Sequence, residues 1–132
     1  MVKIETYQAL ANRLLTAENS RMPIAPITEE YAQISVDEAY QVQFRLIENK
    51  LAATPNSRMA GKKIGLTSLA MQNLFGVYEP IYGCLLSSME VVNDGIIQLE
   101  KLISPKVEPE IAFILKKDLT GPGVSVAEVL RA

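Results

Sequence analysis

The strongest structural signal in the sequence is one stretch, Pro105-Lys106-Val107-Glu108-Pro109-Glu110-Ile111-Ala112-Phe113. Its apolar residues predict a β-strand, and side chains two positions apart on a strand lie on the same face. Glu108 and Glu110 are therefore expected to project together, and like charges held that close repel unless a cation lies between them. Mg²⁺ or Mn²⁺ is the expected cation, because hard divalent metals prefer carboxylate oxygen as a ligand.

A solvated strand face that carries two glutamates is the simpler interpretation of this pattern. Two features favour a metal site instead. Pro109 cannot donate to a ladder, which indicates a sheet edge or a bulge, where sites are commonly built. The continuously apolar run at 111–115 predicts a strand that is covered on both faces.

The chain before this stretch predicts an N-terminal helical region at residues 1–57. Apolar residues recur at helical spacing over 3–18 and predict a first amphipathic helix. Pro23 and Pro26 indicate an extended connector. Ser35 and Glu38 form a capping box that opens a second helix, which ends before residues 54–57. The apolar stripe predicted for its core face comprises Tyr40, Phe44, Ile47 and Leu51.

Residues 58–132 predict the first part of a β-rich core. Strands are expected at 63–66 and 82–86, a brief helix at 68–75, and a tight turn at 93–95 between short apolar pairs. A second capping box at 125–128 opens a helix that has no C-cap before the sequence stops. We therefore expect the chain to be the N-terminal part of a longer protein. The predicted fold class is α+β, with N-terminal helices packed on a β-rich mixed sheet.

The composition excludes several classes of protein. The 132 residues are 48% hydrophobic, which is enough for one modest core. A net charge of −2, with no basic cluster, gives no reason to expect nucleic acid as a partner. Neither a signal peptide nor an apolar run long enough to span a membrane is found in the sequence. The single cysteine, Cys84, lies in an apolar setting, which predicts a buried thiol and suits a reducing cytoplasm. The absence of histidine excludes histidine-based catalysis and histidine-ligated zinc.

Several ordered motifs resemble the hydratase/decarboxylase branch of the fumarylacetoacetate hydrolase superfamily. The matching stretches are Gly61-Lys62-Lys63-Ile64-Gly65-Leu66-Thr67-Ser68, Pro80-Ile81-Tyr82-Gly83, Pro105 to Phe113, and Lys117 to Val124, together with Asp37-Glu38-Ala39-Tyr40. The resemblance extends over essentially the whole chain. It implies an enzyme that acts on small 2-oxo acids in the meta-cleavage degradation of aromatic compounds.

The resemblance also implies the site. Glu108 and Glu110 would bind Mg²⁺ or Mn²⁺, with a third carboxylate expected beyond Ala132. Lys63 would be the catalytic or substrate-binding lysine, although a surface charge at a strand end is the interpretation that its own sequence context favours. Weaker substrate-binding candidates are Thr67, Ser68 and Tyr82; a role in capping the short helix explains the first two equally well. The implied fold is a partial, distorted β-sandwich or roll, and the implied assembly is a homo-oligomer.

One position favours a decarboxylase over a hydratase. Hydratases that resemble this chain carry an aspartate where it has Ile81, and the Pro80-Ile81-Tyr82-Gly83 form resembles the 4-oxalocrotonate decarboxylases. Decarboxylation of 2-oxo-3-hexenedioate is therefore the preferred prediction, and hydration of 2-hydroxypenta-2,4-dienoate is the alternative. A third interpretation is a non-catalytic assembly partner or inactive fragment, associated with the companion enzyme of the pathway.

Overall fold

The computed structural model describes residues 4–132. Its elements are, in chain order, α1 (Ile4–Ser20), α2 (Ile27–Glu30), α3 (Val36–Ala53), β1 (Met59–Gly65), α4 (Leu69–Phe75), β2 (Ile81–Leu86), two short 3₁₀ turns η1 (Ser87–Met89) and η2 (Leu99–Lys101), and α5 (Val126–Arg131). No helix among these residues is long and apolar enough to cross a membrane.

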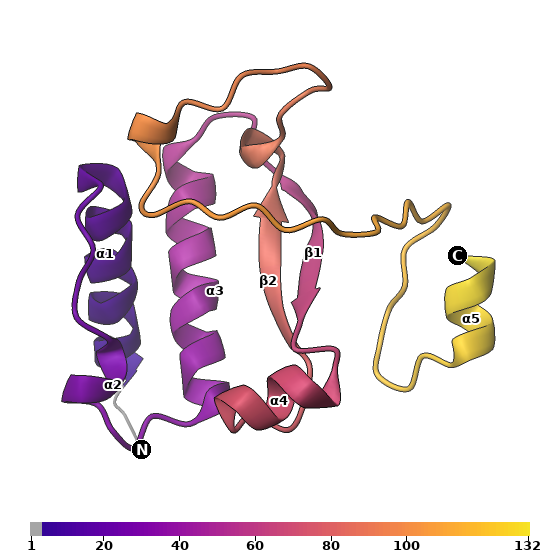
Figure 1. Ribbon diagram of the computed structural model, residues 1–132, viewed down its shortest axis with the longest axis horizontal. Helices are drawn as coiled ribbons and strands as arrows, with labels where there is room; N and C mark the ends of the chain where they lie inside the picture. Colours follow the sequence, from indigo (N-terminus) through magenta and orange to yellow (C-terminus); the bar gives the residue numbers. More distant parts are fainter. Residues whose placement is uncertain (1–3) are drawn as a thin grey trace.

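Helix α3 lies between α1 and the two strands and is buried on two sides (Figure 1). Toward α1, Val42 packs in a cluster with Leu10 and Ala11. Toward the sheet, Ile47 packs against Cys84 and Leu86 of β2. The sequence predicted one apolar stripe on this helix, whereas the structure uses two. The buried thiol expected at Cys84 is confirmed.

Side-chain caps begin α3, α4 and α5 where the sequence predicted them. Ser35 and Glu38 form the expected capping box on α3. Ser68 caps α4, which ends at Gly76 in a left-handed conformation (φ 66°) that glycine adopts without a Cβ clash. The second capping box opens α5 at Ser125. In contrast, the connector predicted as extended contains the four-residue helix α2, with Pro26 as its N-cap residue.

Strands β1 and β2 form a two-stranded antiparallel sheet. Lys63 pairs with Gly83 and Ile64 with Tyr82, and a register shift lies between Met59 and Gly61. Because side chains alternate along a strand, Tyr82, Cys84 and Leu86 share one face. That face packs on α3, since Cys84 and Leu86 are buried against Ile47. The opposite face carries Lys63 and is not covered by α3.

The predicted fold class is confirmed as a mixture of helix and sheet, but the β-rich mixed sheet is not. The strand predicted around Glu108 and Glu110 is wrong for this structure: residues 105–115 are extended but pair with no strand in the part of the chain that is described. The turn at 93–95 forms, with the Gly95 N–H donating to the Val92 carbonyl (2.9 Å), yet no strands flank it. An apolar pattern marks residues for burial but supplies no neighbour to pair with.

Candidate metal and substrate site

Lys63 lies on a face of the sheet that is almost without side chains beside it. Gly83 is opposite Lys63 across the ladder, and Gly61 and Gly65 are its neighbours two positions away on β1. A Cβ added at Gly61 would meet no atom within 4 Å. Lys63 therefore has no side chain directly opposite it or two positions away on β1, although Ile81 and Leu85 of β2 share its face.

The groups it reaches are the two predicted metal ligands. Lys63 Nζ lies 2.9 Å from Glu108 Oε2 and makes a second ion pair with Glu110 Oε1. The two carboxylates thus converge on one cation, as expected for residues two positions apart in an extended segment. The structure brings together Lys63, Glu108 and Glu110, which the sequence identified in motifs over 40 residues apart.

The mutual contacts favour the charged form of each partner. Hydrogen bonds to Glu110 and then to Glu108 raise the pKa of Lys63 above its usual 10.5. The hydrogen bond from Lys63 lowers the pKa of Glu108 below its usual 4.5. At neutral pH the site therefore holds an ammonium group and an ionised Glu108. All three side chains are 44–63% exposed, so the site is open to a ligand from solvent.

The donor set fits a hard divalent cation. Two carboxylates already meet at one positive charge, and Mg²⁺ is commonly held by one or two carboxylates, with water or substrate oxygens filling the remaining positions. Within residues 4–132 no group of three or more Asp, Glu, Cys or His side chains is arranged to hold a metal. Glu108 and Glu110 could therefore supply at most two of the ligands that such a cation needs.

The weaker substrate-binding candidates lie elsewhere. The Ser68 hydroxyl accepts a hydrogen bond from the Met71 N–H (3.3 Å) as the cap of α4, and Thr67 is exposed beside it. Tyr82 projects from the face of the sheet opposite to Lys63, because it pairs with Ile64. The structure therefore groups none of these three side chains with Lys63.

A residue with a strained backbone, Leu66, lies in the sequence between Lys63 and the hydroxyl residues Thr67 and Ser68. Leu66, the first residue after β1, has a left-handed φ of 53°, which costs a side-chain-bearing residue roughly 1–2 kcal/mol. Gln72 of α4 is buried, and its side-chain amide donates to the Leu66 carbonyl (2.8 Å). Such strain persists only where the surrounding contacts enforce it, and it is common near functional sites. The one signal for this contact in the sequence is a glutamine on a short, mostly apolar helix.

An aromatic cluster supports the opposite face of the sheet. The rings of Tyr40 and Tyr82 stack with centroids 4.6 Å apart, and Lys62 Nζ lies 4.3 Å from the centre of the Tyr82 ring. The adjacent lysines Lys62 and Lys63 thus serve different faces: one packs on an aromatic ring, and the other meets the carboxylates.

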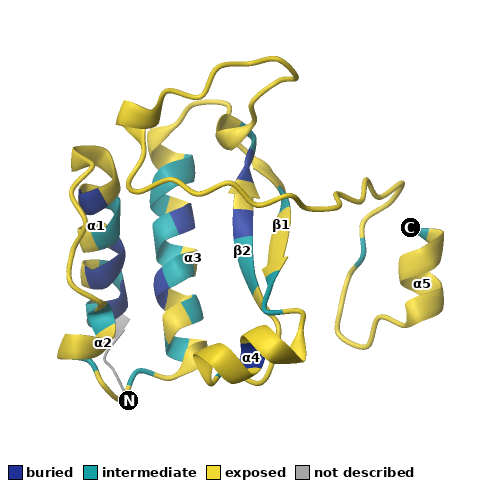
Figure 2. Ribbon diagram, in the orientation of Figure 1, coloured by how far each residue is buried: buried dark blue, intermediate teal, exposed yellow. Residues whose placement is uncertain are grey.

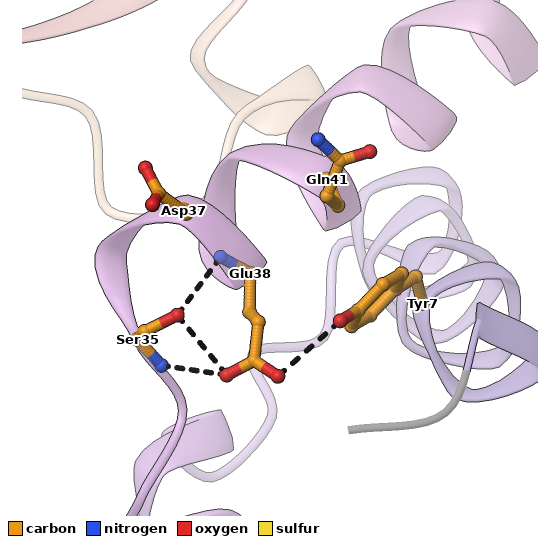
Figure 3. Close-up of a pocket in the computed structure, with 5 residues that line it drawn as sticks. All are labelled: Tyr7, Ser35, Asp37, Glu38 and Gln41. Carbon is orange, nitrogen blue, oxygen red and sulfur yellow. Dashed lines mark hydrogen bonds between the residues drawn. The ribbon is translucent and has the colours of Figure 1, made fainter. Parts of the chain in front are cut away.

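A separate pocket is distant in sequence from this site. It has a volume of about 420 Å³ and is lined by Tyr7, Ser35, Asp37, Glu38 and Gln41 (Figure 3). Its central carboxylate, Glu38, accepts hydrogen bonds from the Ser35 N–H (2.9 Å) and the Tyr7 hydroxyl (3.3 Å). These contacts cap α3 and tie it to α1, so the pocket is explained by helix packing.

Known proteins that resemble this chain are hydratases and decarboxylases. No protein-family model matches the chain. It is 48% identical over 125 residues to a 2-hydroxypent-2,4-dienoate hydratase of Pseudomonas putida, which covers 93% of this chain and 55% of that protein. It is 38% identical over 124 residues to a 4-oxalocrotonate decarboxylase of Pseudomonas sp. strain CF600, over 94% of this chain and 46% of that protein. The resemblance predicted from the sequence is confirmed.

Solved structures extend the likeness to the fold. The 4-oxalocrotonate decarboxylase of Pseudomonas putida G7, complexed with magnesium and adipate, matches with a TM-score of 0.92 and 34% identity. The match covers 100% of this chain and 49% of the decarboxylase, and a complex of the same protein with calcium and acetate matches equally well. The chain therefore spans about half the length of the relatives it matches.

Proposed function

We propose that this chain provides part of a divalent-metal-dependent lyase that decarboxylates 2-oxo-3-hexenedioate to 2-hydroxypenta-2,4-dienoate. The observation that carries the proposal is the convergence of Glu108 and Glu110 on the Lys63 ammonium group, on an exposed face of the sheet. The names of the relatives supply the substrate class, since they are hydratases and decarboxylases of small unsaturated acids. The solved decarboxylase in complex with magnesium and adipate supports both the metal and a six-carbon diacid.

Glu108 and Glu110 would hold Mg²⁺ or Mn²⁺. The bound cation would supply Lewis acidity that stabilises negative charge on the 2-oxo oxygen of the substrate. A third carboxylate ligand stays a prediction. With Glu108 and Glu110 used as metal ligands, the Lys63 ammonium group, which now pairs with both, would be available to a substrate carboxylate on the same face.

The reaction follows from the vinylogous relation between the remote carboxylate and the 2-oxo group. The bond between this carboxylate and the adjacent carbon breaks, and its electron pair passes through the conjugated system to the 2-oxo oxygen. CO₂ leaves, and protonation of the dienolate oxygen gives 2-hydroxypenta-2,4-dienoate. The role of Lys63 is to orient the charged substrate or to transfer that proton.

Ile81 favours decarboxylation over hydration. It pairs with Gly65, and its side chain lies 3.4 Å from the position a Cβ would take there, on the face that carries Lys63. A hydratase needs a group that activates water, whereas loss of CO₂ needs none, and Ile81 provides no such group. The 48% identity to a hydratase favours the second candidate, addition of water to 2-hydroxypenta-2,4-dienoate.

The wider predictions belong to the same proposal. We expect residues 1–57 and 58–132 to be a helical region and the start of a β-sandwich or roll, within a cytoplasmic homo-oligomer. Association with the companion hydratase or decarboxylase is a further expectation. If the chain is instead a non-catalytic partner, it should contact that enzyme but turn over neither substrate.

The test is a paired assay of the protein made from its complete reading frame. With Mg²⁺ or Mn²⁺, we expect CO₂ release from 2-oxo-3-hexenedioate, and we expect the Glu108→Gln/Glu110→Gln variant to lose both metal binding and activity. Lys63→Met should lower kcat/KM by about 10²–10⁴-fold. Lys62→Met is the matched control, since this neighbouring lysine lies on the other face, and its activity should be near that of wild type.

Turnover of 2-hydroxypenta-2,4-dienoate alone would replace the decarboxylase proposal with the hydratase. Turnover of neither substrate, with intact Mg²⁺ binding by calorimetry, would reject both reactions and favour the assembly partner.

A further inference from the structure

Gln72 is the one buried polar residue among those that the structure describes, with 8% of its surface exposed. Its side-chain amide donates a hydrogen bond of 2.8 Å to the Leu66 carbonyl, ahead of the helix that carries it. Its backbone carbonyl accepts from the N–H groups of Gly76 and Val77 at the other end of α4. A buried polar group is costly unless it is hydrogen-bonded. Gln72 has such partners, and through them it fastens both ends of a seven-residue helix.

The residue that Gln72 holds has a backbone conformation that leucine rarely adopts. Leu66 has a φ of 53°, in the left-handed region that favours glycine. A strained conformation of this kind persists where neighbouring contacts enforce it. The Gln72 amide supplies such a contact at the carbonyl of the strained residue itself.

The turn at Leu66 lies next to the lysine-bearing end of β1. Helix α4 is placed at the end of the sheet where β1 finishes and β2 begins (Figure 1). Gly65 makes the last pair of the ladder, with Ile81, whose side chain lies 3.4 Å from the place of a Cβ on Gly65. Lys63 is two positions before Gly65, on the same face of the strand. A change of φ at residue 66 would redirect the chain at the end of this ladder and shift the pair nearest to Lys63.

We propose that Gln72 is a positioning residue for Lys63: its amide holds Leu66 in the left-handed conformation, and this turn fixes the end of β1 from which Lys63 projects. The inference rests on the proposed lyase function, since it gives Gln72 a part in placing the lysine of that site. Gln72 acts through the backbone and not on the substrate. The proposed metal ligands Glu108 and Glu110 lie in another segment, so Gln72 has no part in holding the metal.

The first test is a double-mutant cycle in the protein made from its complete reading frame, with Mg²⁺ and the substrate that the wild type turns over. Gln72→Met keeps a side chain of similar length and removes the amide donor. We expect kcat/KM to fall by about 10–10²-fold, since a misplacement of about 1 Å can cost this much. The Kd for Mg²⁺ should stay within about twofold of wild type.

The second arm of the cycle separates positioning from stability. In a Lys63→Met background, Gln72→Met should cost less than about threefold, because no lysine is left to position. A residue that only stabilises the fold would lower activity equally in both backgrounds. Asn73→Met, at an exposed position of the same helix, is the matched control and should leave activity near that of wild type.

A glycine at position 66 gives an independent test by rescue. Glycine adopts φ > 0 without a Cβ clash, so the turn no longer needs to be enforced. In a Leu66→Gly background, Gln72→Met should therefore cost less than about threefold in kcat/KM. Leu66 is partly buried, and its loss lowers stability. A purely structural role for Gln72 therefore predicts that the double variant is less active than either single variant.

Crystal structures of the same variants measure the turn without activity. In Gln72→Met, φ of Leu66 should become negative and Lys63 should move relative to β2, whereas Gln72→Met/Leu66→Gly should keep the positive φ and the position of Lys63. If Gln72→Met does not fold, Gln72→Asn replaces it, because its amide is one methylene too short to reach the Leu66 carbonyl. If the wild type turns over neither substrate, the proposed function fails, and the crystal structures alone decide the inference.

Three outcomes would overturn the inference. The first is an equal loss for Gln72→Met with and without Lys63, or no loss in either background. The second is the absence of rescue by Leu66→Gly. The third is a Gln72→Met structure in which Leu66 keeps its positive φ and Lys63 has not moved, since other contacts would then hold the turn.

Discussion

Residues 4–86 and residues 87–132 of this chain differ in their relation to solvent. The first region contains every buried residue of the described chain, including Leu10, Ala11 and Val42 between the helices and Leu86 under α3. In the second region no described residue is buried, and all but Ser87, Leu119 and Ala132, which are intermediate, are exposed (Figure 2). The two regions share similar local signals, so the difference lies in what each can pack against.

The two capping boxes make the same point at the level of one helix. Ser35 and Glu38 on α3 have the same hydrogen bonds as Ser125 and Glu128 on α5. Helix α3 continues for 18 residues between two packed surfaces, whereas α5 has 6 residues and none is buried. A cap therefore determines where a helix begins, but tertiary packing determines whether it is anchored.

The largest expected difference between the two regions is in the cost of removing one large apolar side chain. Leu10 is 1% exposed, and Leu10→Ala should lower the free energy of unfolding by about 2–5 kcal/mol. Ile114 is 96% exposed, and Ile114→Ala should change it by less than about 0.5 kcal/mol. Urea unfolding followed by circular dichroism measures both. A cost above that small limit for Ile114→Ala would mean that the second region is packed in solution.

The sequence predicted the elements whose signals are local. The bounds of α1, α3 and α4 follow from apolar periodicity, from the Ser35 and Ser68 caps, and from the need for φ > 0 at Gly76. The strand prediction for residues 107–115 was wrong because a strand needs a partner to pair with, and an apolar pattern is not evidence of a partner. The role of Gln43 could not be assigned from sequence, because its hydrogen bonds to the Tyr82 carbonyl and the Cys84 N–H depend on where β2 lies.

The candidate site was also predicted only where its signals are local. The shared direction of Glu108 and Glu110 needs only an extended backbone, and the structure bears it out in their common contact with Lys63. The proximity of Lys63 depends on the fold between residues 63 and 108, and the residues alone gave no signal for it. The glycines around Lys63 carry information only once the register places Gly83 opposite it.

A smaller effect should separate the two capping boxes. Ser35→Ala removes the N-cap of a helix that is part of the core, and the free energy of unfolding should fall by about 1 kcal/mol. Ser125→Ala removes the same contacts from α5, but the cooperative transition should be unchanged because α5 contributes no buried residue to it. Equal losses in the two variants would mean that α5 unfolds together with the first region.

A single hydrogen bond between α3 and β2 should have a similar or smaller effect. Tyr40→Phe keeps the ring stacked on Tyr82 and removes the hydroxyl that accepts from the Tyr82 N–H, so the cost should be about 0.5–1.5 kcal/mol. Hydrogen exchange at the Tyr82 amide should quicken, and exchange at the Lys63 amide in the ladder should not. If both amides quicken equally, the hydroxyl stabilises the whole sheet and not its edge.

The smallest effect is a titration that reports packing in the first region. Burial, followed by the negative charge of Glu38, raises the pKa of Tyr7 above its usual 10.0. Folding therefore favours the neutral phenol, and this contribution to stability is present below about pH 10 and is lost as the pH rises through the raised pKa.

Phenolate absorbance in wild type should contain a component that titrates above the ordinary tyrosine range and that Tyr7→Phe removes. Burial also raises the pKa of Tyr31, so Tyr31→Phe serves as the parallel variant that should leave the Tyr7 component in place. If Tyr7→Phe removes a component in the ordinary range instead, the phenol is solvated, and the packing of α1 on α3 is looser in solution than its 9% exposure at Tyr7 implies.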